Sequence, residues 1–263
     1  MTTNRKYLLA ECRLPEVEAQ LKRNPIILIP LGATEQHGPH APFGTDSMLS
    51  SEVCARLARR IDALVAPAVP YGVSGDHRGF AGVPYVSVPT LSGVIRDLAI
   101  SFTTGGFKRV IFVNGHYTNS IAIHAALMEA DDLLPNDAIV YGFNYWDPLP
   151  PEQSEAYLGF REGLHANIGE TSAVMAIDES LIDLGAAVAE YPEFPGGVSA
   201  PLVSAFFLSG MGRTYRATRS GVWGDPSAST REKGLEYFAQ IEEACVRFMD
   251  GVDKAFAAYP ERP

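Results

Sequence analysis

Apolar runs alternate along this chain with longer segments in which apolar residues recur at helical spacing. The runs lie at 26–31, 63–69, 109–115 and 138–143, and the helical segments at 47–61, 91–104 and 119–131. Short buried strands that alternate with amphipathic helices are typical of a mostly parallel sheet covered by helices on both faces. The pattern predicts an α/β fold, and because no linker divides the chain we expect a single domain over residues 1–263.

The last quarter of the chain shows a different pattern. The segment 189–225 is irregular and rich in Gly and Pro, which predicts loops. The segment from about 229 to 257 is long, acidic and amphipathic, which predicts an outer helix.

Two histidine-bearing motifs directly follow predicted strands. The motif EQHGPH comes after the run 26–31, and NGHYTNS comes at the end of the run that begins at Arg109. In parallel sheets, ligands bind beyond the carboxyl ends of the strands. We therefore expect these two distant pieces of chain to meet at one edge of the sheet.

The side chains at these strand ends are of the kind that binds metal ions. Glu35 and His37 lie two residues apart, so an extended backbone would place them on one face, and Asp46 follows a bend rich in Gly and Pro. His116 comes from the second strand end. Paired divalent cations require such carboxylates and imidazoles together with a bridging ligand. The spacing favours a metal site over a solvated loop.

Other candidate residues leave two readings open. Glu170, in the motif HANIGETS with His165, begins an apolar helical run, where a carboxylate is favoured electrostatically even without a metal ion. His40 either orients His37 through a hydrogen bond or caps the loop. His124, within an apolar helical run, is expected to be structural.

Composition and charge exclude several classes of protein. The chain is 46% hydrophobic and carries a net charge of -10, with scattered Lys and Arg, which argues against nucleic-acid binding and for a small or neutral ligand. Neither a signal-peptide core nor an apolar run of membrane-spanning length is present, so we expect a cytoplasmic protein with no membrane partner. Cys12, Cys54 and Cys245 lack CxxC spacing, so neither a disulfide framework nor a thiolate zinc site is expected.

These motifs together resemble the creatininase family of metal-dependent amidohydrolases. The resemblance rests on PLGATEQHGPHAPFGTD, NGHYTNS, HANIGETS and GVWGDPSASTREKG, which span Pro30 to Gly234. It implies a three-layer α/β sandwich, two divalent metal ions per chain (zinc, manganese or iron) and a homohexamer. The metal ligands that it implies are Glu35, His37, His116 and Asp46, the last as the bridge, and Glu170 is the best remaining carboxylate for a fifth ligand. Thr118 stands where creatininase has an acidic ligand, which shifts weight onto Glu170.

The resemblance also implies a reaction. Metal-bound hydroxide would attack the carbonyl of a small cyclic amide, with creatinine the leading candidate. The implied catalytic residues are His165, as the proton shuttle, and Glu170, and the implied substrate-binding residues are Tyr117, Trp146 and His77.

Some positions depart from creatininase itself. A second tryptophan is absent near Phe160 and Arg161, and the segment around His77 differs, so that Arg78 and Arg161 become candidates for binding a substrate carboxylate. A formamide or a lactone as substrate, or a non-catalytic metal-stabilised assembly component, remain the alternatives. A serine hydrolase is disfavoured because no G-x-S-x-G motif follows a strand.

Overall fold

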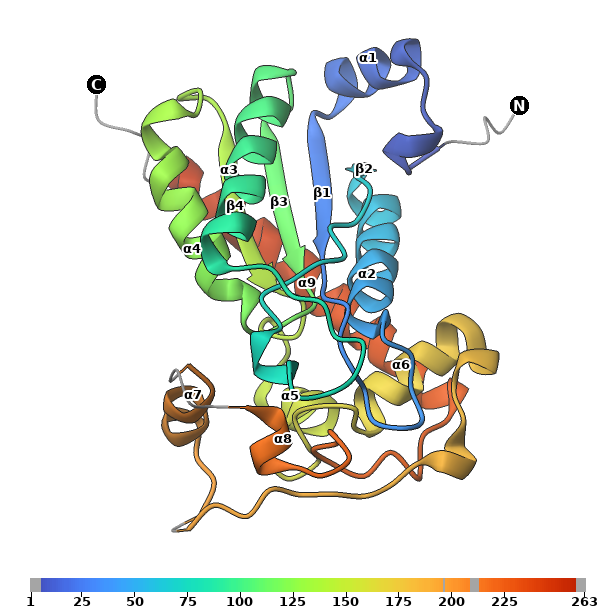
Figure 1. Cartoon of the computed structure of the whole chain (residues 1–263). Coiled ribbons are helices and arrows are strands. Elements are labelled where there is room, and N and C mark those ends of the chain that lie inside the picture. The colour runs from blue at the N-terminus through green and yellow to red at the C-terminus, as the bar shows by residue number, and fades with distance from the viewer. Residues whose placement is uncertain (1–5, 196, 209–212, 259–263) are drawn as a thin grey trace.

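A parallel sheet forms the centre of the molecule. The computed structural model describes residues 6–195, 197–208 and 213–258. Four strands pair in the order β2-β1-β3-β4 (Figure 1). They are β1 (Ile26–Leu31), β2 (Leu64–Val65), β3 (Arg109–Asn114) and β4 (Ile139–Asn144). The α/β fold and all four predicted strands are confirmed, although β2 covers only two residues of the run 63–69. The regular pairing ends after Ala66 N–H donates to the Leu28 carbonyl (2.9 Å), and the next bond to β1 is donated by Val69 N–H to the Pro30 carbonyl (3.0 Å).

Helices cover both faces of the sheet. One face carries α2 (Thr45–Ile61), α6 (Ile168–Asp178) and α9 (Arg231–Ala258), and the other carries α3 (Val88–Thr104) and α4 (Asn119–Ala130). Alternate strand residues divide between the two cores: Ile26 and Leu28 pack with the first layer of helices, whereas Ile27 and Ile29 pack with the second. Burial on both faces explains why the strands read as continuous apolar runs rather than alternating ones.

Shorter elements complete the described chain. They are α1 (Leu14–Arg23), α5 (Pro151–Leu158), α7 (Ala200–Leu208), α8 (Thr214–Ala217) and 3-10 turns at Leu9–Glu11, Gly75–His77, Asp131–Leu133, Glu179–Leu181 and Leu184–Ala186. The expectation that 189–225 forms only loops was wrong, since α7 and α8 lie there; residues 196 and 209–212 fall outside the described residues. Within the described part of the chain, no helix has the length and apolar character that crossing a membrane requires.

The carboxyl ends of the strands lie level with one another. Leu31 pairs with Asn114, and Asn114 pairs with Asn144. The Asn114 amide donates to Asn144 Oδ1 (2.7 Å), and Asn119 donates to Asn114 Oδ1 (3.1 Å) and to the Gly32 carbonyl (3.0 Å). These hydrogen bonds connect the ends of β3 and β4, the start of α4 and the residue that follows β1, beneath the loops that carry the site.

Close packing of α9 on α6 requires a glycine. A methyl group added at Gly234 would collide with the Ser172 carbonyl oxygen of α6, whereas one added at Gly251 of the same helix would meet nothing within 4 Å. Gly234→Ala should therefore lower the free energy of unfolding by about 1–3 kcal/mol through overpacking. Gly251→Ala should raise it by up to about 1 kcal/mol, because Ala is the better helix former.

Thermal or urea unfolding of both variants beside the parent chain tests this contrast. Equal changes in the two variants would show that α9 does not approach α6 as closely as described.

Candidate metal centre

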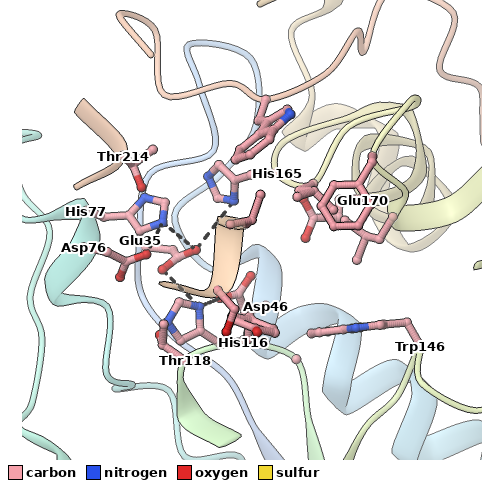
Figure 2. A pocket seen from close by; sticks show the side chains of 18 of the residues that line it. Glu35, Asp46, Asp76, His77, His116, Thr118, Trp146, His165, Glu170 and Thr214 are labelled. Atoms are coloured by element: carbon pink, nitrogen blue, oxygen red, sulfur yellow. Dashed lines mark hydrogen bonds and ion pairs between the residues drawn. The ribbon is translucent and has the colours of Figure 1, made fainter. Parts of the chain in front are cut away.

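Four segments that are distant in sequence bring carboxylates and imidazoles together at the carboxyl end of the sheet. Glu35 and His37 lie in the loop after β1, Asp46 in the first turn of α2, His116 in the loop after β3, and Glu170 in the first turn of α6. Figure 2 shows Glu35, Asp46, His116 and Glu170 pointing toward one another. All five are buried, with at most 5% of their surface exposed. The expected meeting of the two strand-end motifs is confirmed, and the HANIGETS segment joins them.

Asp46 stands between two groups of side chains. Its Oδ1 lies 3.2 Å from His37 Nε2, and its Oδ2 lies 3.2 Å from His116 Nδ1. Glu170 Oε2 completes the first group at 3.8 Å from His37 Nε2, and Glu35 Oε2 completes the second at 3.2 Å from His116 Nδ1. The carboxylate of Asp46 therefore faces both groups at once, as a bridging ligand must.

The imidazoles of His37 and His116 each have a hydrogen-bond partner on the side away from the carboxylates. That partner determines which ring nitrogen carries the hydrogen. The Thr118 hydroxyl donates to the Val73 carbonyl (2.6 Å), so its oxygen is left to accept from His116 Nε2–H (2.5 Å). His37 Nδ1 lies 3.3 Å from the carbonyl oxygen of Glu35. A carbonyl only accepts, so when the rings are neutral, as metal-binding imidazoles must be, the outer nitrogen carries the hydrogen and the inner nitrogen is bare.

Acceptors thus face acceptors in the middle of the site. Glu35 Oε2, His37 Nε2 and Asp46 Oδ2 are buried and have no hydrogen-bond partner among the described residues. Buried charges without partners are strongly unfavourable unless a cation lies between them. Mixed nitrogen and oxygen donors suit zinc, manganese or iron. Two groups, Glu35 with Asp46 and His116, and His37 with His165 and Glu170, have ligand atoms within 4.8 Å of one another. Asp46 also lies 3.2 Å from His37, so these residues fit a pair of divalent metal ions with Asp46 between them.

The pKa values of the buried groups also indicate that positive charge is stabilised at this site. Burial disfavours charge on His37, but the nearby carboxylates of Asp46 and Glu170 outweigh it and raise the pKa of the ring well above its usual value. The carboxylates of Glu35 and Asp46 raise the pKa of His116 in the same way. Without a metal ion, protons on the inner nitrogens would therefore supply the positive charge between the carboxylates. Burial opposes ionisation of Asp46 too, yet the nearby rings of His116 and His37 hold its pKa far below the usual range. Burial raises the pKa of Glu35 to about 7.

A cavity of about 410 Å³ opens onto this cluster. His165, His77, Tyr117, Trp146 and Phe160 line it together with Glu35, Asp46, His116 and Glu170. Tyr117 is half exposed, whereas His77 is buried. The three substrate-binding residues that the resemblance implies, Tyr117, Trp146 and His77, thus line the same cavity. Its volume is that of an ordinary small-molecule site.

The structure also bears on the roles expected for two arginines and two histidines. Arg78 and Arg161 are not among the residues that line the cavity, and Arg161 lies on the surface with its guanidinium 3.4 Å from Glu155. His40 Nε2 contacts the Thr171 hydroxyl at 3.0 Å, so it ties its loop to α6 rather than orienting His37. His124 is exposed on α4. The two arginines therefore lose their suggested role in binding a substrate carboxylate.

Two further residues of the site were not singled out from the sequence. Gln36 lies between Glu35 and His37, and strict alternation would point it away from both, yet it contacts His77 and His165. Asp76 lines the cavity from a 3-10 turn, and its Oδ1 is buried without a hydrogen-bond partner among the described residues. The only signal for Asp76 was its position next to His77.

Comparison with known proteins identifies the family. A family model described as creatinine amidohydrolase matches residues 10–249. The chain belongs to the creatininase family. It is accordingly a hydrolase of the amidohydrolase type, and the resemblance noted in its motifs is confirmed.

Relatives within the creatininase family act on different compounds. The creatinine amidohydrolase of Pseudomonas putida is 31% identical over 93% of this chain and 95% of its own length. The mycofactocin precursor peptide peptidase of Mycolicibacterium smegmatis is also 31% identical, over 84% of this chain and 83% of its own. Among solved structures, a creatininase variant of the Zn-Zn type superposes with a TM-score of 0.76 at 27% identity, covering 98% of this chain and all of the other.

The geometry predicts how metal binding responds to single substitutions. Asp46→Ala should abolish binding of both ions, because its two oxygens face different groups, whereas His37→Ala should remove one ion and leave the group around His116. Elemental analysis of protein purified without chelator measures the number of ions per chain. His124→Ala, an exposed histidine outside the cluster, is the matched control and should retain the parent's metal content. Unchanged metal content in Asp46→Ala would contradict the assigned ligand set.

Proposed function

We propose that this protein hydrolyses a C–N bond of a small amide at two divalent metal ions held by Glu35, His37, Asp46, His116 and Glu170. The observation that carries the proposal is the arrangement of buried acceptors facing one another around Asp46. Solved creatininases of the Zn-Zn and Mn types share this fold, which supports zinc or manganese as the ions. The ions would activate a water molecule and polarise the amide carbonyl.

His165 is placed to move the proton that such a reaction requires. Its Nε2 donates to the carbonyl of Gln36 (2.8 Å), so its Nδ1 is the bare nitrogen, and that atom lies 3.7 Å from Glu35 Oε1. Burial lowers the pKa of His165 to about 4, which keeps the ring neutral near pH 7 and leaves its Nδ1 without a hydrogen. A neutral imidazole at this place can take a proton from water and return it to the leaving nitrogen.

The walls of the cavity suit a flat, small substrate. Trp146 and Tyr117 supply aromatic surface, and His77 lies beside Glu35. A cyclic amide fits this description, and creatinine is the first candidate because the Pseudomonas putida relative is named as a creatinine amidohydrolase.

A peptide is the second candidate, and a particular feature favours it. A second cavity of about 410 Å³ lies alongside the first, and Tyr117 and Asp147 border both. A substrate longer than a single ring would extend past these two residues into the second cavity. The Mycolicibacterium smegmatis relative is named as a peptide peptidase.

Several other features stay predictions. They are the binding of two ions per chain, the assembly of a homohexamer, the cytoplasmic location and the organisation as a single domain.

The function is tested by metal-dependent hydrolysis. Protein purified without chelator should convert creatinine to creatine or, if the second candidate is correct, cleave a short peptide, and stripping the metal should abolish the reaction. Restoring zinc or manganese should return it, because the ions activate the attacking water. Chromatography of the products after each step gives the measurement. Protein with its full complement of metal that hydrolyses neither creatinine, other cyclic amides, formamides nor peptides would contradict the proposal.

The role of His165 makes a separate prediction. His165→Ala should keep both metal ions but lower kcat roughly 100-fold or more, the usual contribution of a general acid–base group. Metal content and far-UV circular dichroism serve as the controls for folding. Full activity in this variant would exclude His165 as the proton carrier.

A further inference from the structure

The side chain of Gln36 lies at the centre of a closed set of hydrogen bonds behind the metal cluster. Its Oε1 accepts from Gly38 N–H (2.8 Å), and its Nε2 lies 3.2 Å from the Gly221 carbonyl oxygen. An amide nitrogen donates and an amide oxygen accepts, so these two backbone partners fix which end of the amide is which. A reversed amide would place donor against donor at Gly38 and acceptor against acceptor at Gly221.

Gly221 holds the amide in this place by close approach. Its φ of 87° lies in the left-handed region, and a Cβ there would collide with Gln36 Oε1. The segment around Gly221 is tied to the site as well, since Trp223 and His165 exchange backbone hydrogen bonds (2.9 and 3.2 Å). The position of the Gln36 amide is therefore built into the fold.

Counting hydrogens then assigns the protons of two histidines. The Gln36 amide has two hydrogens and three neighbours: the Gly221 carbonyl, His77 Nδ1 (2.9 Å) and His165 Nε2 (3.2 Å). His165 Nε2 also lies 2.8 Å from the backbone carbonyl of Gln36, which can only accept, so this nitrogen carries a hydrogen and cannot receive another. The second amide hydrogen must go to His77 Nδ1.

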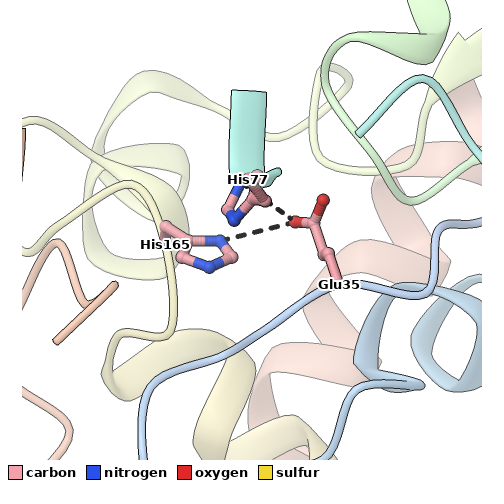
Figure 3. A group of neighbouring side chains, drawn as sticks. All are labelled: Glu35, His77 and His165. Atoms are coloured by element: carbon pink, nitrogen blue, oxygen red, sulfur yellow. Dashed lines mark ion pairs between the residues drawn. The ribbon is translucent and has the colours of Figure 1, made fainter. Parts of the chain in front are cut away.

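Both rings turn a nitrogen toward Glu35 (Figure 3), but one of these nitrogens carries a hydrogen and the other is bare. His77 Nδ1 accepts, so its Nε2 carries the hydrogen, and both atoms that it approaches, Glu35 Oε1 and Asp76 Oδ2, are acceptors at 3.5 Å. His165 carries its hydrogen on Nε2 and turns a bare Nδ1 toward the same Glu35 oxygen.

We propose that Gln36 is a positioning residue that fixes the neutral tautomers of His77 and His165, through its side chain and its backbone carbonyl respectively. His77 is thereby a hydrogen-bond donor in the cavity and His165 a proton acceptor. The tautomers do not depend on the proposed reaction; only their use in catalysis rests on the proposed function.

The tautomers also decide whether Glu35, His77 and His165 can bind a metal ion together. Their ligand atoms lie within 4.8 Å of one another, which is a spacing that a metal ion accepts. A metal ion requires a bare nitrogen from each imidazole, and His77 offers an N–H there instead. His77 thus turns a hydrogen toward Glu35, and the three side chains do not form a third metal site.

Nitrogen NMR of protein labelled with ¹⁵N only in histidine tests the proposal, because protonated and bare ring nitrogens have widely separated chemical shifts. With the His77 signals assigned by their loss in His77→Gln, the parent protein should show a bare Nδ1 and a protonated Nε2. In Gln36→Met, His77 Nδ1 should shift because it has lost its hydrogen-bond donor. In Gln36→Glu, the same nitrogen should become protonated, because it now faces a carboxylate.

The signals of His165 provide an internal control, since its partner is the backbone carbonyl and both variants should leave its Nε2 protonated. Gln20→Met is a matched external control: Gln20 is also buried, and its amide bonds the Asn24 and Asp62 carbonyls (both 2.7 Å). A protonated His77 Nδ1 in the parent, or unchanged His77 signals in both Gln36 variants, would overturn the proposal. Loss of amide hydrolysis alone would not, so the two proposals fail separately.

Discussion

The level register of β1 and β3 is the constraint on which the site depends. Leu31 and Asn114 are direct partners, so the loop that carries Glu35 and the loop that carries His116 leave the sheet at the same height. Gly115 allows the first turn of α2 to approach, since a Cβ there would lie 2.5 Å from the Asp46 carbonyl oxygen. A shift of one residue between these strands would turn each core residue to the opposite face and separate the two ligand groups.

The site combines a large electrostatic cost with a means of offsetting it. The carboxylates of Glu35, Asp46 and Glu170 lie close to the imidazoles of His37, His77, His116 and His165, and all but His165 are buried. Burying so many ionisable groups without compensating charge is strongly unfavourable. Each imidazole has a hydrogen-bond partner on its outer side: Thr118 for His116, and Gln36 for His77. The outer partners decide which nitrogen faces inward, which is how surrounding residues orient ligands in known metal sites.

Much of this arrangement could be predicted from the sequence, because the strands are strongly apolar and the ligand types are distinctive. The strand 26–31 has the predicted bounds, and the four ligands that the family resemblance implies converge with Glu170, the fifth carboxylate or imidazole chosen from the sequence. Alternation failed at Gln36, because the chain leaves β1 as an irregular loop in which neighbouring side chains no longer point to opposite faces. Helix α7 was missed because glycines and prolines surround it, and the role of Thr118 depends on a carbonyl from a distant loop that no local pattern reveals.

The hydrogen bond between Gln36 and Gly221 has a consequence for how the chain folds. These residues are 185 positions apart, and the bond between His165 and the carbonyl of Gln36 spans 129. Contacts of such long range form slowly, because the entropy of closing the intervening loop is lost before the contact is gained. The helices close far shorter loops, and the β1–β3 pairing, which joins Ile26 to Arg109, closes one of intermediate length. The cavity is therefore completed late, and a refolding chain would acquire its secondary structure before it acquires tight affinity for metal.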